Sequence, residues 1–187
     1  MQSPYSFLVT PVKGKRYNNT KQIGNIDLVV STSEENYTTS NREATVIETP
    51  INYEGPIEKG DTLLVHHNVF KFYNDMYGNR QSGRSFLKDN LFLVDDEQFF
   101  AYKKDNEWIG YDRYCFLKPI PVEESYIYKP LSKEPLMGEV AILNETLQNK
   151  GVKIGDKVCY KPNQEYEFKV DNQTLYRLYD HCITLVL

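Results

Sequence analysis

The sequence lacks long apolar runs and is poor in alanine, tryptophan and cysteine. No apolar stretch reaches the roughly 18 residues that a membrane-spanning helix needs, so we expect none. Three widely spaced cysteines, Cys115, Cys159 and Cys182, favour neither a disulfide framework nor a zinc site, and reduced thiols are typical of intracellular proteins. Met1–Thr10 has no basic segment followed by a long apolar one. We therefore expect a cytoplasmic protein without a signal peptide.

An excess of positive charge is also missing, because the formal net charge is -4 and the pI is about 5.5. Binding to nucleic acid needs a surplus of Lys and Arg on one face, so nucleic acid is excluded as the main partner. The chain contains no nucleophile elbow, P-loop or dinucleotide fingerprint. These absences predict a protein that is not an enzyme, with no catalytic residues and no cofactor.

Candidate metal ligands are few. His66 and His67 would point to opposite faces if they lay on a strand, so they are not expected to share one ion. The acidic triplet Asp95-Asp96-Glu97 lacks the spaced oxygen ligands and the glycine of a calcium loop and reads as a solvated turn. No metal site is predicted.

Aromatic and β-branched residues are abundant, with 15 Tyr and 9 Phe, and they alternate with polar residues between Gly, Pro and Asn clusters. This pattern predicts an all-β fold of many short strands. The expected strands are Tyr5–Val12, Ala44–Thr49, Asp61–Tyr73, Leu91–Val94, Gln98–Lys103, Trp108–Tyr111, Cys115–Pro119, Tyr126–Tyr128, Glu139–Leu143, Lys157–Lys161, Tyr166–Val170, Leu175–Tyr179 and Cys182–Leu187.

A long polar stretch, Arg16–Arg42, interrupts this pattern. Structureless loops of this length are unusual in compact domains and are commonly functional or disordered. Its apolar island is Ile26–Val30, in which Ile26, Leu28 and Val30 would share one face of an extended chain. The island is either a docking segment or an ordinary buried strand, and the residues alone do not decide between these.

Two halves of the chain resemble each other. Glu43–Ile47 parallels Gly138–Ile142, and Ile57–Leu63, with its Gly-Asp pair, parallels Val152–Val158. Asp105-Asn106 also parallels Asp171-Asn172, which would place an insertion at about 72–98 of the first half. With a boundary near Pro121, the domains are residues 1–121 and 122–187. Such small domains have modest cores, and oligomerisation often adds to their stability.

The order of these elements resembles the GroES-type co-chaperonins, whose phage-encoded members are divergent. The residues that carry the resemblance are Phe7–Val12, Gly60-Asp61, Gly138-Glu139-Val140, Val152–Val158 and Asp180–Val186. The resemblance implies two GroES-like β-barrel domains in tandem. It also implies that the stretch at about 16–42 is a mobile loop that binds a chaperonin. The second half has no comparable loop in this interpretation and would be a structural copy.

In that family the loop motif that binds the chaperonin is apolar, and Gly24-Asn25-Ile26-Asp27-Leu28 stands in its place here, with Asp27 as a departure. The predicted chaperonin-binding residues are Ile26, Leu28, Val29 and Val30. The resemblance implies a GroEL-type ring as partner, a homo-oligomeric ring of this chain with seven-fold symmetry by analogy, and unfolded proteins as indirect substrates. A phage-encoded member would act in the host cytoplasm.

Two other functions stay open. The chain is a structural or adaptor protein of a virion or other ring assembly if the barrel is used without a chaperonin. An enzyme is the third alternative, because medium-chain dehydrogenases contain a GroES-like domain, although their cofactor domain and zinc ligands are missing here.

Overall fold

The computed structural model describes residues 1–18, 20–23, 26–29, 39–121, 133–171 and 173–187, and for residues 20–23, 26–29 and 133–135 it describes the backbone only. Its contacts divide the chain into two units, Met1–Asn106 and Glu107–Leu187. No helix in the described part is long and apolar enough to cross a membrane.

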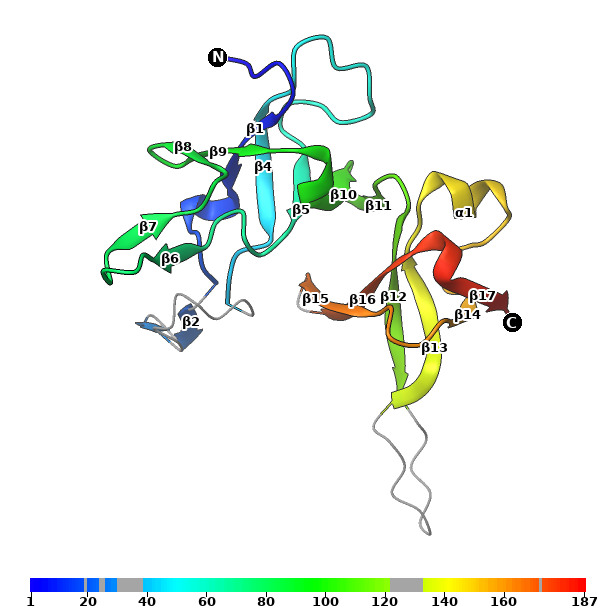
Figure 1. Ribbon diagram of the computed structural model, residues 1–187. Coiled ribbons are helices and arrows are strands. Elements are labelled where there is room, and N and C mark those ends of the chain that lie inside the picture. Colours follow the sequence, from blue (N-terminus) through cyan, green and yellow to red (C-terminus); the bar gives the residue numbers. More distant parts are fainter. Residues whose placement is uncertain (19, 24–25, 30–38, 122–132, 172) are drawn as a thin grey trace. The chain divides into compact units, whose positions relative to one another are not determined.

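The first unit consists of short strands and two 3₁₀ turns (Figure 1). They are β1 (Phe7–Pro11), η1 (Val12–Gly14), β2 (Thr20–Ile23), β3 (Ile26–Val29), β4 (Glu43–Glu48), β5 (Thr62–Val65), β6 (Phe72–Asn74), β7 (Arg80–Ser82), β8 (Phe86–Lys88), β9 (Leu91–Val94), η2 (Asp96–Gln98) and β10 (Phe99–Lys104).

The second unit contains the one α-helix of the described chain. Its elements are β11 (Glu107–Gly110), β12 (Tyr114–Pro121), β13 (Lys133–Ile142), α1 (Glu145–Asn149), β14 (Lys157–Tyr160), β15 (Tyr166–Val170), β16 (Gln173–Tyr179), η3 (Asp180–Cys182) and β17 (Ile183–Val186). The strand expected at Tyr126–Tyr128 lies outside the described residues.

The strands form two large sheets and two hairpins. One sheet has the order β11-β10-β5-β4-β1-β9-β8 and the other has the order β15-β16-β12-β13-β14-β17, while β2-β3 and β6-β7 are separate pairs. The all-β prediction is confirmed. The two closed barrels are not, because both strand orders are linear over the described residues.

Read from β10 to β8 and from β17 to β15, the two sheets have the same strand order and the same register. Val9 pairs with Val46 as Leu117 pairs with Val140, and both pairs stand next to a register shift. The other cross-strand pairs agree in the same way. Ala44↔Leu63 corresponds to Gly138↔Val158, Leu8↔Leu93 corresponds to Phe116↔Arg177, and Ala101↔Leu64 corresponds to Leu185↔Cys159.

This register changes three details of the sequence comparison. Val46 is equivalent to Val140, so the segment equivalent to Glu43–Ile47 is residues 137–141 and not Gly138–Ile142. The counterpart of the Asp171 turn is Asp89 rather than Asp105, since β8-β9 matches β15-β16. The insertion therefore shrinks from about 72–98 to the hairpin β6-β7, which has no counterpart among the described residues of the second unit.

The second copy of the pattern begins at β12, which ends at Pro121 and corresponds to β1. The two compact units meet after Asn106, so β12 lies in the second unit. The boundary expected from the sequence was near Pro121. β12 is bonded on both sides, to β13 and to β16, so it lies in the middle of the second sheet. The connection that corresponds to the long polar stretch is residues 122–132, which lie outside the described part.

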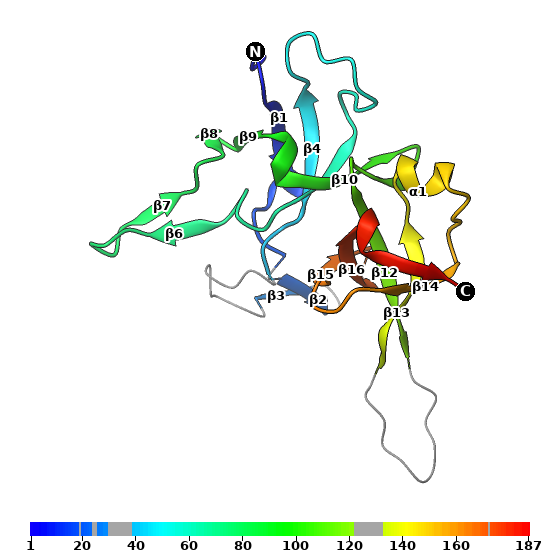
Figure 2. The ribbon, with the colours of Figure 1, turned by 45° about the vertical axis from the view of Figure 1, so that its right-hand side comes forward.

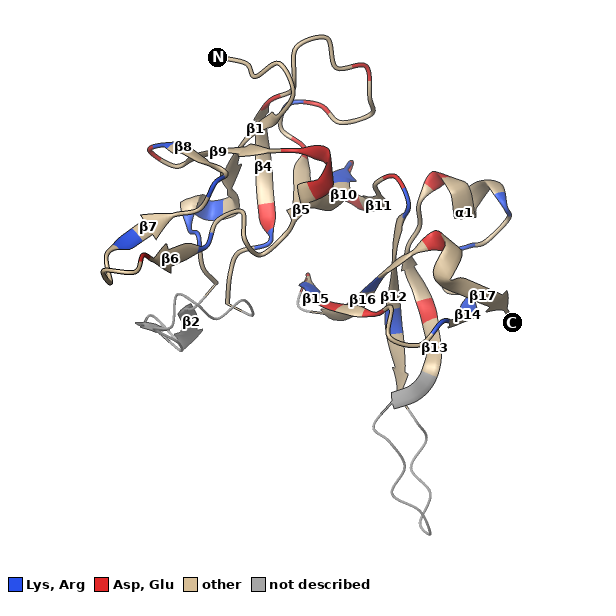
Figure 3. Cartoon of the chain, in the orientation of Figure 1, with Lys and Arg blue, Asp and Glu red and all other residues tan. Residues whose placement is uncertain are grey.

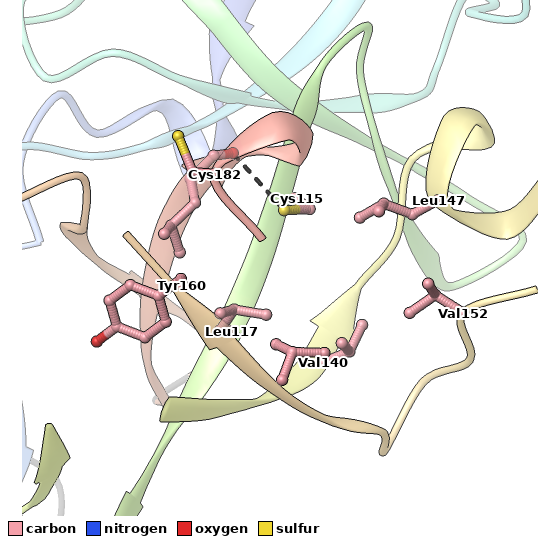
Figure 4. Packing of buried hydrophobic residues seen from close by; sticks show 9 residues of the cluster. Cys115, Leu117, Val140, Leu147, Val152, Tyr160 and Cys182 are labelled. Atoms are coloured by element: carbon pink, nitrogen blue, oxygen red, sulfur yellow. Dashed lines mark hydrogen bonds between the residues drawn. The ribbon is translucent and has the colours of Figure 1, made fainter. Parts of the chain in front are cut away.

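Each unit has its own apolar core. In the second unit the core includes Cys115, Leu117, Val140 and Val158, and Leu147 of α1 packs against it (Figure 4). In the first unit the position of Cys115 is taken by Phe7, whose ring meets Tyr53 and Phe99 edge-on at centroid distances of 4.9 and 5.5 Å. The same positions are thus buried in both copies with side chains of different size.

A Gly-Asp turn leads into β5 and, in the second unit, into β14. Gly60 N–H donates to the Val46 carbonyl at 2.9 Å, and Gly155 N–H donates to the Val140 carbonyl at 2.8 Å. The carboxylate of the aspartate that follows accepts from the backbone N–H two residues before each glycine, at 2.8 Å in both copies. Both glycines have positive φ, +98° and +91°, which L-residues with a side chain rarely adopt.

Replacing Gly155 by Ala should destabilise the protein by roughly 1–2 kcal/mol because of this backbone conformation. No atom lies within 4 Å of the added Cβ, so the cost is not a clash. Urea unfolding of Gly155→Ala and of Gly60→Ala, with exposed Lys153→Ala as control, measures the loss. Unchanged stability in both glycine variants would contradict the role of this turn.

Candidate functional site

The predicted binding residues Ile26, Leu28 and Val29 lie on β3, and Val30 lies outside the described residues. β3 pairs with β2 in an antiparallel hairpin with Ile23 opposite Ile26 and Lys21 opposite Leu28. This hairpin belongs to neither large sheet. In the described part of the chain, β3 therefore pairs with β2 and with no strand of either large sheet.

The two ends of the stretch are held together in a neck, which we define as residues 16–18 and 39–42. Tyr17 forms an isolated antiparallel bridge with Ser40. Asn18 N–H donates to the Thr39 carbonyl at 2.7 Å, and Asn41 N–H donates to the Arg16 carbonyl at 2.9 Å. The predicted mobile loop of residues 16–42 is thus tied down at both ends.

Buried polar side chains strengthen the neck. Asn41 is 2% exposed, and its amide donates to the carbonyls of Val12 and Lys15 while its oxygen accepts from Glu43 N–H. Ser40 is 3% exposed and donates to the His67 carbonyl at 2.9 Å. Buried polar groups with satisfied hydrogen bonds fix one backbone geometry, so the neck has a defined conformation.

Aromatic rings contact the neck through Arg16. The Arg16 guanidinium lies 4.2 Å from the ring centre of Phe72 and less than 5 Å from those of Phe86 and Phe92. It also donates to the Ser82 hydroxyl at 3.0 Å. Phe72 and Ser82 belong to the inserted hairpin β6-β7, so this insertion buttresses the neck through cation–π and polar contacts.

Tyr17 connects the neck to the same hairpin, because its hydroxyl oxygen accepts from Phe72 N–H at 2.7 Å. Tyr17→Phe removes this acceptor and should lower the free energy of unfolding by about 1 kcal/mol. Tyr77→Phe is the matched control, since Tyr77 is 82% exposed. Equal stability of the two variants in urea unfolding would argue against a structural role of this bond.

His66 and His67 follow β5, and their rings lie close together, with centroids 4.0 Å apart and planes tilted by 34°. The expectation that they point to opposite faces is wrong, because the strand ends at Val65 before reaching them. Burial lowers the pKa of His67 from 6.5 to about 4, and the nearby charges of His66, Arg42 and Lys71 act in the same direction. The folded protein therefore holds His67 neutral.

This lowered pKa predicts acid sensitivity. Above pH 6.5 His67 is neutral in both states and contributes no pH dependence, whereas between pH 6.5 and 4 the unfolded chain binds the proton more readily. Stability should fall over this window by roughly 1–2 kcal/mol after allowance for partial exposure. His67→Gln should flatten this part of the profile in urea titrations relative to the native protein. A profile unchanged by His67→Gln would contradict the assignment.

Other candidate chemistry is limited in the described residues. No group of three His, Cys, Asp or Glu lies together in a way that could hold a metal ion there. The 3₁₀ turn η2 is acidic, with Asp96 and Glu97, and it is drawn in the acidic colour just before β10 (Figure 3). Asp95 caps this turn and accepts from the Ser6 hydroxyl at 2.6 Å. Burial raises the pKa of the Cys115 thiol to about 12, so the reactive thiolate is not formed at neutral pH.

One groove of about 640 Å³ lies in the first unit, between the start of β6 and the end of β9. It is lined by both signs of charge, Lys71 and Arg84 with Asp95 and Glu97. Beside it, the hairpin β6-β7 projects away from the large sheet (Figure 2). Its tip exposes Met76 (89%) and Tyr77 (82%).

The protein matches no family model, and no curated protein matches it either. The resemblance to the GroES-type co-chaperonins consequently stays a prediction. Sequence reasoning located the apolar island but missed the neck and its aromatic support. The polar run Ser40-Asn41-Arg42 directly before a strand was the available signal, because such residues are buried only when they are bonded.

Proposed function

We propose that the protein is a co-chaperonin that caps a chaperonin ring through the apolar residues of β3 and so assists ATP-dependent protein folding. One observation supports this proposal above others: Ile26–Val29 is an apolar strand segment in a small hairpin apart from both large sheets, and it is carried on a fixed neck. A strand that is separate from both large sheets of the described chain suits a segment that docks on a partner.

The mechanism is docking of an extended segment into an apolar groove of the chaperonin. Ile26 and Leu28 fall on one face of the strand, and Asp27 falls on the other. Alternate side chains then give specificity while main-chain hydrogen bonds contribute affinity. The acidic Asp27 lies away from the groove in this arrangement, so it is compatible with apolar docking.

The neck serves this mechanism by limiting the entropy that binding must overcome. With residues 16–18 and 39–42 held by hydrogen bonds and aromatic contacts, the ends of the segment are already fixed before docking, so their conformational entropy is not lost on binding. A homo-oligomeric ring, seven-fold by analogy, would present several such segments together and raise the avidity. ATP would be hydrolysed by the chaperonin, and unfolded proteins would be handled only indirectly.

The second candidate is a structural or adaptor protein of a virion or other ring assembly. The exposed Met76 and Tyr77 favour it, because a protruding hairpin tip with two large apolar side chains suits a fixed protein contact. In that role β6-β7 rather than β3 would carry the main interface.

The decisive experiment is a pull-down of the protein with a GroEL-type chaperonin in the presence of ATP. Ile26→Asp with Leu28→Asp should abolish capture, because two carboxylates would have to be desolvated in an apolar groove. Met76→Asp with Tyr77→Asp is the control, since it adds the same charge and removes apolar area from a different hairpin.

Capture that survives the β3 double variant would exclude this segment as the binding site. Failure of the folded native protein to bind any chaperonin would contradict the co-chaperonin proposal and favour the structural role. Loss of binding only in the Met76/Tyr77 variant would move the contact to the hairpin tip.

A further inference from the structure

The groove of about 640 Å³ in the first unit is built from two parts of the fold. One part is the base of the hairpin β6-β7, where Lys71 precedes β6 and Arg84 follows β7. The other part is the turn η2 and the residue before it, which supply Glu97 and Asp95. The groove therefore receives positive charge from the hairpin base and negative charge from the turn. Its size lies in the range of small-molecule pockets, about 300–1,000 Å³.

These charges are not neutralised by one another. In the part of the chain that the structure describes, no ion pair and no side-chain hydrogen bond involves Lys71, Arg84 or Glu97. Asp95 differs, because its carboxylate accepts from the Ser6 hydroxyl at 2.6 Å. The groove thus holds opposite charges apart, and a ligand that carries both signs can contact both parts at once.

A buried hydroxyl group connects the two parts. Ser85 lines the groove and is 6% exposed. Its hydroxyl oxygen accepts from the Gln98 side-chain amide at 3.2 Å, and its backbone carbonyl accepts from Leu93 N–H at 2.7 Å. No acceptor for the Ser85 hydroxyl proton occurs among the described residues. Because a buried donor without an acceptor is costly, this hydroxyl favours an anionic group in the groove.

The rest of the lining supplies apolar contact. Phe72 and Tyr73 of β6 and Leu93 of β9 line the groove. Gly83 adds no side chain to it, and a Cβ at this position would lie 3.2 Å from the Asn68 carbonyl oxygen. The groove thus combines apolar walls with separated charges, which is the composition of a site for a small polar ligand.

We propose that this groove binds a short zwitterionic peptide. The terminal carboxylate of the peptide accepts hydrogen bonds from Lys71, Arg84 and Ser85. Its amino group donates to the Glu97 carboxylate, and its apolar side chains contact Phe72. None of these residues belongs to the neck or to β3, so the proposal does not rest on the co-chaperonin function.

A free amino acid offers the same two end groups, so the first experiment compares ligand length. Saturation-transfer NMR detects weakly bound ligands and would be recorded with leucine, leucylleucine and leucylglycylleucine. The peptides should bind about fivefold more tightly than leucine, because they reach both charged parts of the groove. N-acetyl-leucylleucine and leucylleucine amide should each bind about fivefold more weakly than leucylleucine, since each lacks one charge.

Variants locate the binding in the groove. Arg84→Ala and Glu97→Gln should each weaken the binding of leucylleucine by about fivefold, because each removes one charged partner. Lys88→Ala and Glu54→Gln are the matched controls, since both side chains are exposed in the first unit and neither lines the groove.

The proposal is overturned if leucylleucine shows no saturation transfer, or if leucine binds as tightly as the peptides. Equal binding of the blocked and the free peptides, or equal affinity in the groove variants and the controls, would also overturn it. Tighter binding of phosphoethanolamine than of leucylleucine would replace the peptide by a phosphate ligand. All of these measurements are made without a chaperonin, so the two proposals succeed or fail separately.

Discussion

Both sheets depend on the glycine–aspartate turn that returns the chain into the strand next to β4 or β13. The glycine N–H and the aspartate carbonyl bond the same valine, Val46 or Val140, from the turn. Because that valine is buried, this exchange decides which face of the strand points inward, and the register of the adjacent strands follows from it. Only glycine adopts the required backbone at this point without strain.

The turn explains which parts of the fold could be predicted. The Gly-Asp pair and the alternating strands are local signals, so the all-β class and the resemblance of the halves were accessible from the sequence. The counterpart of Asp171 in the first half could not be identified from the sequence, because Asp89, Asp105 and Asp171 all adopt positive φ at turns. The register of β9 and β16 against β1 and β12 distinguishes Asp89 from Asp105, and that is a long-range property.

The aromatic support of the neck could not be predicted from the sequence for the same reason. Arg16 is stabilised by rings that follow it by more than fifty residues, two of them outside the inserted hairpin on β8 and β9. In the sequence these residues read only as the ends of a polar stretch. Position within the chain therefore suggested a loop that is mobile from residue 16 to residue 42, whereas packing fixes residues 16–18 and 39–42.

Function should be sought where the two copies depart from each other, since the shared register accounts for folding alone. Among the described residues, the first copy departs by the hairpin β6-β7, which has no counterpart in the second unit and exposes Met76 and Tyr77. The second departs at β17, where the exposed Leu185 and Val186 replace the covered Ala101 and Tyr102 of β10. Both departures leave the pairing of the shared strands intact. Each can then change without disturbing the register that both copies need.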